Sequence, residues 1–190
     1  MKRIRLWLFA VLLFSLVACQ QVIPDAKNWP IEDFTFTDQH GQQFGLADLK
    51  GKVWVADFIF TRCADVCPPM TANMAKLQKM AKEKGLDVHF VSFSVDPEND
   101  TPDALKTYVE KFQGDSSNWH LLTGYTQQDI ERFAQKNFKA VVKKPQEGDQ
   151  VIHGTNFYLV DQNGTIVKYY SGLNDVPYEE ILKHIDMLQE

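Results

Sequence analysis

Apolar and polar residues alternate along this chain in a pattern that predicts a mixed α/β domain. Alternating stretches at 33–37 and 43–46 predict a β-hairpin. The nearly continuous apolar run at 52–60 predicts a central strand that is buried on both faces. Two more strands are predicted at 87–95 and 119–122.

Helical spacing of apolar residues predicts the segments between these strands. Four helices are expected: Pro68 to Gly85, Pro102 to a stop at Gly114, a stretch capped by Thr126, and one opening at Pro177. The polar stretch 136–150 predicts an exposed loop or irregular hairpin, and 157–170 predicts a strand-turn-strand. This order predicts a thioredoxin-like α/β sandwich, with one extra inserted unit (a peroxiredoxin-like elaboration) and an N-terminal β-hairpin.

The N-terminus carries targeting signals. A basic start precedes an apolar run from Leu6 to Ala18, which is too short for a membrane span and fits the core of a signal peptide. Leu16-Val17-Ala18-Cys19 looks like a bacterial lipobox, which predicts cleavage before Cys19 and a diacylglycerol on its sulfur. We therefore expect a lipoprotein signal peptide at 1–18, a lipid anchor and tether at 19–29, and one domain at 30–190. An uncleaved anchor or a plain secretory signal would also place the domain outside the cell membrane.

The charge of the mature chain excludes one class of partner. Removal of residues 1–18 leaves 17 Lys and Arg against 25 Asp and Glu, a net charge of −8. An acidic domain without basic clusters argues against nucleic-acid binding. We expect a monomer on the extracytoplasmic face of the membrane.

Two cysteines lie between a predicted strand and a predicted helix. Once Cys19 is lipidated, Cys63 and Cys67 are the remaining thiols, in a compartment that tolerates disulfides. A disulfide across so short a loop would stabilise the domain little. The helix N-terminus favours thiolates, which are both nucleophiles in disulfide exchange and ligands for soft metal ions. The pair therefore predicts redox chemistry, metal binding or both.

One histidine is placed to join the cysteines. His153 comes directly before a predicted core strand, at the end of the sheet where the cysteine loop is expected. The others are assigned structural or solvated places: His40 in a hairpin turn, His89 and His120 in strands, and His184 on the polar side of the last helix. Met70 and Met74 are spaced as core residues of a helix rather than as thioether ligands.

Three motifs in this order resemble the Sco/SenC family over residues 30–188. They are Phe60-Thr61-Arg62-Cys63-Ala64-Asp65-Val66-Cys67-Pro68, Ser94-Val95-Asp96-Pro97 with the residues to Pro102, and Val151-Ile152-His153-Gly154 with the residues to Asp161. The resemblance implies a thioredoxin-like fold that binds one copper, Cu(I) or Cu(II), through Cys63, Cys67 and His153. It also implies a role in assembling the binuclear copper site of cytochrome c oxidase, with subunit II of the oxidase as partner.

The chain departs from the family pattern at two positions. Ala64 stands where the family commonly has proline, and Ile152 where an acidic residue often precedes the histidine. Asp65 and Asp96 match the family. For Asp65 the sequence leaves two interpretations open: a role at the site or toward a partner, or simple solvation. For Asp96, which precedes a proline, we favour ordinary turn chemistry.

Two alternatives to copper delivery use the same thiols. A thiol–disulfide oxidoreductase would attack a partner's disulfide with Cys63 or Cys67. Against general oxidoreductase activity, Thr155 occupies the place where many thioredoxin-like proteins have a cis-proline. Peroxide reduction is the weakest alternative, because Thr61 and Arg62 lie in the adjacent strand end.

Overall fold

A six-stranded sheet forms the centre of the computed structural model, which describes residues 23–190. Across the sheet the strands are β1 (Trp29–Pro30), β10 (Thr165–Ser171), β9 (Asn156–Val160), β4 (Val53–Ile59), β5 (Val88–Ser94) and β6 (Trp119–Leu122). β4, β5 and β6 are parallel, whereas β9 runs antiparallel to β4 and β10 antiparallel to β9. This mixed order confirms the predicted thioredoxin-like architecture.

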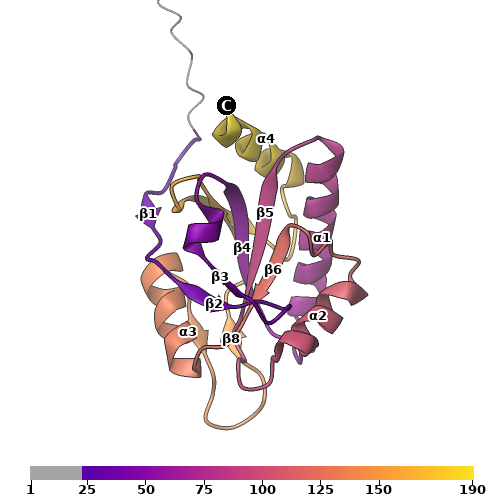
Figure 1. The fold of residues 1–190 in the computed structure, drawn as a ribbon, viewed down its shortest axis with the longest axis vertical. Helices are drawn as coiled ribbons and strands as arrows, with labels where there is room; N and C mark the ends of the chain where they lie inside the picture. The colour runs from indigo at the N-terminus through magenta and orange to yellow at the C-terminus, as the bar shows by residue number, and fades with distance from the viewer. Residues whose placement is uncertain (1–22) are drawn as a thin grey trace, which may run out of the picture.

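Helices and a hairpin cover the sheet. The helices are α1 (Cys67–Glu83), α2 (Pro102–Lys111), α3 (Gln127–Phe133) and α4 (Tyr178–Gln189). The predicted hairpin is present as β2 (Thr35–Thr37) and β3 (Gln43–Gly45), followed by the 3₁₀ turn η1 (Leu46–Leu49). In Figure 1 the hairpin and α3 lie on one side of the central strands, and α1 and α2 lie on the other.

The core is built on β4, in which all seven residues are buried, as the apolar run predicts. On the hairpin side an aromatic cluster fills the space between the sheet and α3: Phe34, Phe36, Phe58, Phe93, Phe133 and Phe138. On the other side Met70 and Met74 of α1 are fully buried, which confirms their assignment to the core.

The stretch 136–150 differs from the predicted exposed loop in its first half. A π-helical turn, η2 (Ala134–Phe138), ends at Lys139 in the left-handed conformation. Phe138 is 1% exposed and packs edge-on against Phe58 and Tyr158, so an aromatic anchor holds this segment to the core. The hairpin alternative was correct for the second half, where β7 (Val142–Lys143) pairs with β8 (Ile152–His153).

Two single residues also differ from expectation. His184 is buried rather than on a polar face, because its Nδ1 lies 2.6 Å from the Tyr170 hydroxyl of β10. At the end of α2 it is Gln113 that adopts the left-handed conformation, with φ 60°. Gly114 is required for packing instead, because a Cβ there would lie 2.5 Å from a methyl group of Val109.

The structure describes only part of the N-terminal region for which the sequence makes predictions. The signal peptide at 1–18 and Cys19 lie outside the described residues. The described part of the predicted tether, residues 23–29, packs on the sheet: Ile23 is buried, and the Lys27 N–H donates to the Val167 carbonyl at 2.7 Å. The folded part therefore begins before residue 30. Among residues 23–190 no helix combines the length and apolar character needed to cross a bilayer.

Candidate metal centre

The two cysteines lie on the loop that joins β4 to the first turn of α1. After β4 ends, the Cys63 N–H donates to the Phe60 carbonyl in a turn. α1 begins at Cys67, and Pro68 fits its first turn because an N–H at that position would have no helical partner. The free N–H of Cys67 points back and donates to Cys63 Sγ at 3.3 Å. The helix start thus places a donor and the positive end of its dipole at the Cys63 sulfur.

A buried carboxylate, Asp100, holds the strand end that precedes this loop. The Thr61 hydroxyl donates to it at 2.6 Å, and the Thr61 backbone N–H lies 3.2 and 3.3 Å from its two oxygens. The Ser94 hydroxyl at the end of β5 donates at 2.6 Å. Burial raises the pKa of Asp100, and the hydrogen bonds from Ser94 and Thr61 only partly oppose it. One side chain thus ties the cysteine loop to the neighbouring strand.

His153 reaches the same place from the other end of the chain. Because β9 is antiparallel to β4, the residues before β9 lie beside the loop that follows β4. His153 pairs with Val142 of β7, and its ring stands edge-on to Phe60 with centroids 5.8 Å apart. Its Nδ1 lies 2.9 Å from the Gly154 carbonyl. A carbonyl oxygen only accepts, so this hydrogen bond places a proton on Nδ1 and leaves Nε2 to face the sulfurs.

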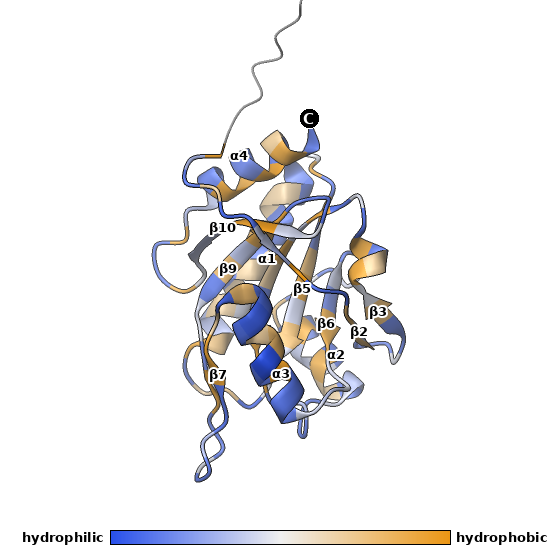
Figure 2. Ribbon diagram, turned by 90° about the vertical axis from the view of Figure 1, so that its left-hand side faces the viewer, coloured by the Kyte–Doolittle hydropathy of each residue, from blue (hydrophilic) through white to orange (hydrophobic). Residues whose placement is uncertain are grey.

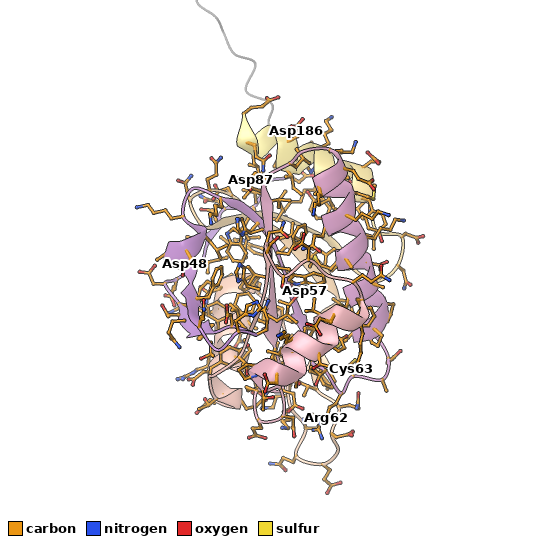
Figure 3. All side chains as sticks on the ribbon, turned by 45° about the vertical axis from the view of Figure 1, so that its right-hand side comes forward. Asp48, Asp57, Arg62, Cys63, Asp87 and Asp186 are labelled. Atoms are coloured by element: carbon orange, nitrogen blue, oxygen red, sulfur yellow. The ribbon has the colours of Figure 1, made fainter. Side chains whose placement is uncertain are left out.

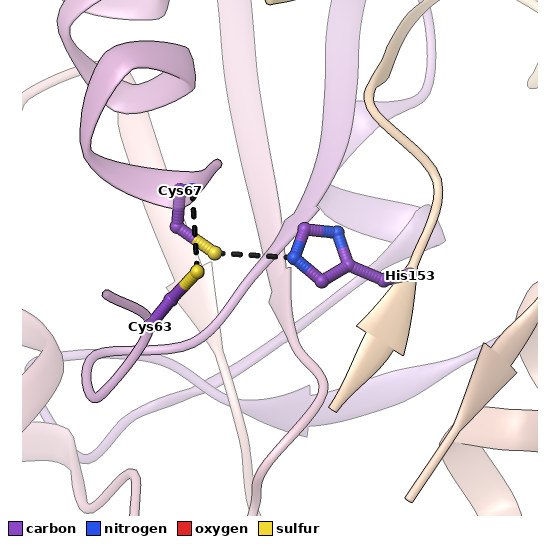
Figure 4. Close-up of side chains that lie close together, drawn as sticks. All are labelled: Cys63, Cys67 and His153. Carbon is purple, nitrogen blue, oxygen red and sulfur yellow. Dashed lines mark hydrogen bonds between the residues drawn. The ribbon is translucent and has the colours of Figure 1, made fainter. Parts of the chain in front are cut away.

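The three predicted ligands converge in the structure. His153 Nε2 lies 3.1 Å from Cys67 Sγ, and one ligand atom from each of Cys63, Cys67 and His153 lies within 4.8 Å of the other two (Figure 4). Both cysteines are free thiols. In the part of the chain that the structure describes, no other group of three or more His, Cys, Asp or Glu residues is so arranged.

The remaining strand and turn histidines do not reach this site. His40 is exposed, as expected for a turn. His120 stacks on Phe44 with ring centroids 3.7 Å apart, and burial, together with the nearby His89, lowers its pKa to about 4. These contacts support the structural role that the sequence suggested for His120.

The two thiols differ sharply in acidity. Burial by itself raises the pKa of Cys63, but its interactions with His153 and Cys67 outweigh burial and lower the pKa to about 6. Burial and the hydrogen bond with Cys63 raise the pKa of Cys67 well above its ordinary value. At neutral pH the pair therefore consists of a Cys63 thiolate at the surface side and a fully buried Cys67 thiol.

A second carboxylate, Asp57, lies inside β4 in the midst of apolar neighbours. Figure 3 shows it deeper in the domain than Arg62 and Cys63. The Ser92 hydroxyl donates to one oxygen at 2.5 Å, and the other oxygen is buried without a partner. Burial raises the pKa of Asp57 to about 7, against the opposing effects of the Ser92 hydrogen bond and of the nearby His153. The apolar run predicts the burial of Asp57 but not the partners of its two oxygens.

Asp96 has a larger role than the turn chemistry we favoured from the sequence. Its backbone carbonyl does close a turn, accepting from the N–H groups of Asn99 and Asp100. Its buried carboxylate also accepts from Arg62 at 3.1 Å and from the Lys144 ammonium at 2.8 Å. Burial would raise the pKa of Asp96, but Lys144, Asn99 and Arg62 together hold it below its usual value. The carboxylate thereby links the residue before Cys63 to the segment that follows β7.

Asp65, which the sequence left open, is exposed at the tip of the cysteine loop. Its backbone contributes a hydrogen bond that helps to lower the pKa of Cys63. No hydrogen bond of its carboxylate to the site is present. The carboxylate of Asp65 therefore faces solvent.

The donor set fits a soft metal ion of low coordination number. Two sulfurs and one imidazole nitrogen suit Cu(I), and the imidazole also accommodates Cu(II). A structural zinc site would require a fourth protein ligand, and none lies within reach among residues 23–190. The buried hydrogen bonds of Asp100 and Asp96 hold the two ligand-bearing segments in place, as outer partners of metal ligands commonly do.

Comparison with known proteins gives one consistent family. The SCO1/SenC family model matches residues 24–190. A crystal structure of a SCO1/SenC family lipoprotein from Bacillus anthracis is 59% identical, with a TM-score of 0.87 over 89% of this chain and 100% of that chain. BsSco, described as a member of the Sco family of cytochrome c oxidase assembly proteins with a disulfide switch, is 50% identical, with a TM-score of 0.83 over 89% and 98% of the two chains. Bradyrhizobium japonicum ScoI with copper bound is 29% identical, with a TM-score of 0.66 over 82% and 99%.

Proposed function

The chain belongs to the SCO1/SenC family, and we propose that it binds one copper ion on the extracytoplasmic face of the membrane and helps to assemble the binuclear copper site of cytochrome c oxidase. The convergence of Cys63, Cys67 and His153 is the observation that carries this proposal. The copper-bound relative and the oxidase-assembly relative support it. The recipient is subunit II of the oxidase, which holds that copper site.

The geometry suits a site that holds copper and then releases it. Cys63 and Cys67 supply thiolate sulfurs, and His153 supplies Nε2 from a separate segment of the chain. Three protein ligands leave room for a ligand from the recipient while copper passes across. The low pKa of Cys63, about 6, means that this thiolate is available at neutral pH without a base.

The test is a titration of the reduced, full-length chain in detergent with Cu(I) and with Cu(II). Cys63→Ala and Cys67→Ala are expected to lose Cu(I) binding, and His153→Ala to weaken Cu(II) at least tenfold while the domain stays folded. His40→Ala, which removes an exposed histidine from a turn, is the matched control. Wild-type Cu(II) affinity in His153→Ala would remove His153 from the site.

Membrane attachment through Cys19 is part of the same proposal, supported by the lipoprotein relative. Lipid on Cys19 would hold the domain near the membrane-bound oxidase. Cys19→Ala is expected to move the protein from the membrane fraction to the soluble fraction. Unchanged fractionation would show that another segment anchors the chain.

A second function is favoured by the unequal acidity of the thiols. The Cys63 thiolate would attack a disulfide of the recipient, forming a mixed disulfide and releasing one recipient thiolate. Cys67 would then lose its proton and attack Cys63, which releases the second recipient thiolate and leaves a Cys63–Cys67 disulfide. The recipient gains two electrons, and this chain supplies them.

The rate of alkylation tests that asymmetry. In the metal-free chain, iodoacetamide is expected to label Cys63 with a midpoint near pH 6, and at pH 7 about a hundredfold faster than Cys67. Cys67→Ser is expected to trap the mixed disulfide with oxidised subunit II. Equal labelling of the two cysteines would remove the physical basis of this function.

A further inference from the structure

Exposed large hydrophobic side chains are few in residues 23–190, and they are not scattered. Val141 is 68% exposed, Ile152 is 60% exposed and Tyr169 is 42% exposed. Ile152 lies in β8 and Val141 directly precedes β7, so two of these three belong to the β7–β8 ribbon, the paired segment that carries His153. Apolar groups clustered on a surface commonly mark a site of interaction.

The pairing of the ribbon places these two side chains on one face. Val142 pairs with His153, and Lys143 pairs with Ile152. Side chains alternate along a strand, so Val142 and His153 share the inward face, and Val141, Lys143 and Ile152 share the outward face. Val142 is buried, in agreement with this assignment. Val141 and Ile152 thus lie on the face of the ribbon opposite to the face that carries His153.

A groove adjoins this face between α3 and β7, where Figure 2 shows the two elements side by side. Its volume is about 810 Å³, and Val141 forms part of its lining. The charged residues of the lining are three cations, Arg132, Lys139 and Lys143, and one carboxylate, Glu131. Glu131 already accepts from the Lys143 ammonium and from the Lys144 N–H.

The charge of this groove is opposite to that of the chain. The mature chain has 17 Lys and Arg against 25 Asp and Glu, whereas the groove lining has three cations against one carboxylate. Arg132 pairs with Asp129 and Lys143 with Glu131, so Lys139 is the lining cation that makes no ion pair among residues 23–190. An acidic partner would be repelled by most of the surface and attracted here.

We propose that Val141 and Ile152, together with the cations of the α3–β7 groove, form the docking surface for the protein that receives copper, which presents an apolar patch edged by carboxylates. This rests on the proposed function and adds the face of the domain that the recipient uses. Docking there acts on the neighbour of His153 in the chain, on a ribbon held by only two residue pairs. Binding of the recipient and the position of the histidine ligand are therefore coupled.

The experiment measures binding of the full-length chain to the copper-site domain of subunit II, in its reduced, copper-free form, so that no copper transfer is needed. Val141→Ser is expected to weaken binding about tenfold. Arg132→Glu is expected to slow association and to reduce its dependence on salt. Tyr169→Ser, which removes the third exposed hydrophobic residue from β10, is the matched control and should bind as wild type. Cu(I) affinity should be unchanged in all three variants, since none changes a ligand.

Each other outcome overturns the docking surface as placed here. Wild-type binding by Val141→Ser would do so, and so would the absence of any binding by the wild-type chain. Sedimentation that shows a dimer lost in Val141→Ser would assign the face to a second copy of this chain. Failure of the proposed function is distinguishable: the wild-type chain would then bind the domain, with the expected loss in Val141→Ser, but would transfer no copper to it.

Discussion

The two segments that carry the candidate metal ligands are built very differently. The cysteine loop follows β4, which pairs with β5 at seven positions and is buried along its whole length. The histidine comes from the β7–β8 ribbon, which has two residue pairs. Ile152 in β8 and Val141 directly before β7 are strongly exposed. The loop is held by the buried Asp100. The ribbon is held by Lys144, which pairs with the buried Asp96 and with the exposed Glu98.

On the proposed function, this contrast would allow one site to bind copper and then release it. Buried hydrogen bonds fix the thiols before any ion arrives, so little ordering remains to be done on binding. The histidine segment has two strand pairs against seven for β4 and β5, so on this proposal it would shift more easily than the cysteine loop. We therefore expect changes on the cysteine side to alter folding, and changes on the histidine side to alter Cu(II) affinity.

The largest effect is expected at Asp57, beneath the cysteine loop. Its pKa is raised by burial from 3.8 to about 7, so between these pH values the folded state holds a proton that the unfolded state has lost. The folded state is then progressively destabilised as pH rises from 4 to 7, by about 4 kcal/mol in total, and no further above pH 7. In the metal-free chain, Asp57→Asn should not lose this stability. The difference in free energy of unfolding between Asp57→Asn and wild type should therefore increase in favour of the variant as pH rises from 4 to 7.

Urea unfolding at pH 4 to 8 measures this difference. Asp87→Asn, at an exposed carboxylate that precedes β5, is the control and should follow the wild-type curve. Parallel curves for Asp57→Asn and wild type would mean that the Asp57 carboxylate is ionised in the folded state throughout.

The second effect is expected at Asp100. Asp100→Ala leaves the Thr61 N–H and the hydroxyls of Thr61 and Ser94 without their acceptor in a buried place. The free energy of unfolding should fall by about 3 kcal/mol. Asp103→Ala, at an exposed carboxylate in the first turn of α2, should cost less than about 1 kcal/mol. Equal effects of the two variants would contradict the anchoring role of Asp100.

The same contrast explains what could be predicted from the sequence. The strand, the loop and the helix around Cys63 follow from apolar runs, Pro68 and Gly85, which are local signals. His153 could be placed because strand order alone brings the two ends together. These features depend on periodicity and topology, and the sequence carries both.

The groups that hold the site in place could not be predicted in the same way. Lys144 lies in a stretch that looks like a polar loop, and its partner Asp96 is 48 residues away. Asp57 stands in an apolar run whose burial on both faces was predicted, yet its unpartnered oxygen depends on side chains from other strands. The burial of Phe138 and His184 was not predicted for a related reason. Their neighbours in the sequence are polar, but Phe138 packs on Phe58 and His184 bonds with Tyr170, residues far away in the chain.

The third effect tests the histidine side at Lys144. Lys144→Met removes the ammonium that lies 2.8 Å from Asp96 and 2.7 Å from Glu98. Since these contacts are partly exposed, the free energy of unfolding should change by less than about 1 kcal/mol. Cu(II) affinity should fall about tenfold, because the segment beside His153 loses its fixed position, and Cu(I) affinity should stay near wild type.

Lys143→Met is the matched control for that titration of the isolated chain. The Lys143 ammonium pairs only with Glu131, at 3.0 Å on the surface, and does not reach the cysteine side. A fall in Cu(I) affinity equal to that in Cu(II) affinity would mean that Lys144 supports the thiols, and the contrast between the two segments would then fail.

The smallest effect is expected at Gln150, whose side chain links the segment before β8 to the cysteine loop. Its side-chain amide donates to the Arg62 carbonyl at 3.4 Å, and it is exposed. A long hydrogen bond in water adds little, so Gln150→Ala should change Cu(II) affinity by no more than about twofold. Competition titration against a chelator resolves a difference of that size. A loss of Cu(II) affinity as large as that of Lys144→Met would mean that the Gln150 contact holds the ribbon as firmly as the contact of Lys144 with the buried Asp96.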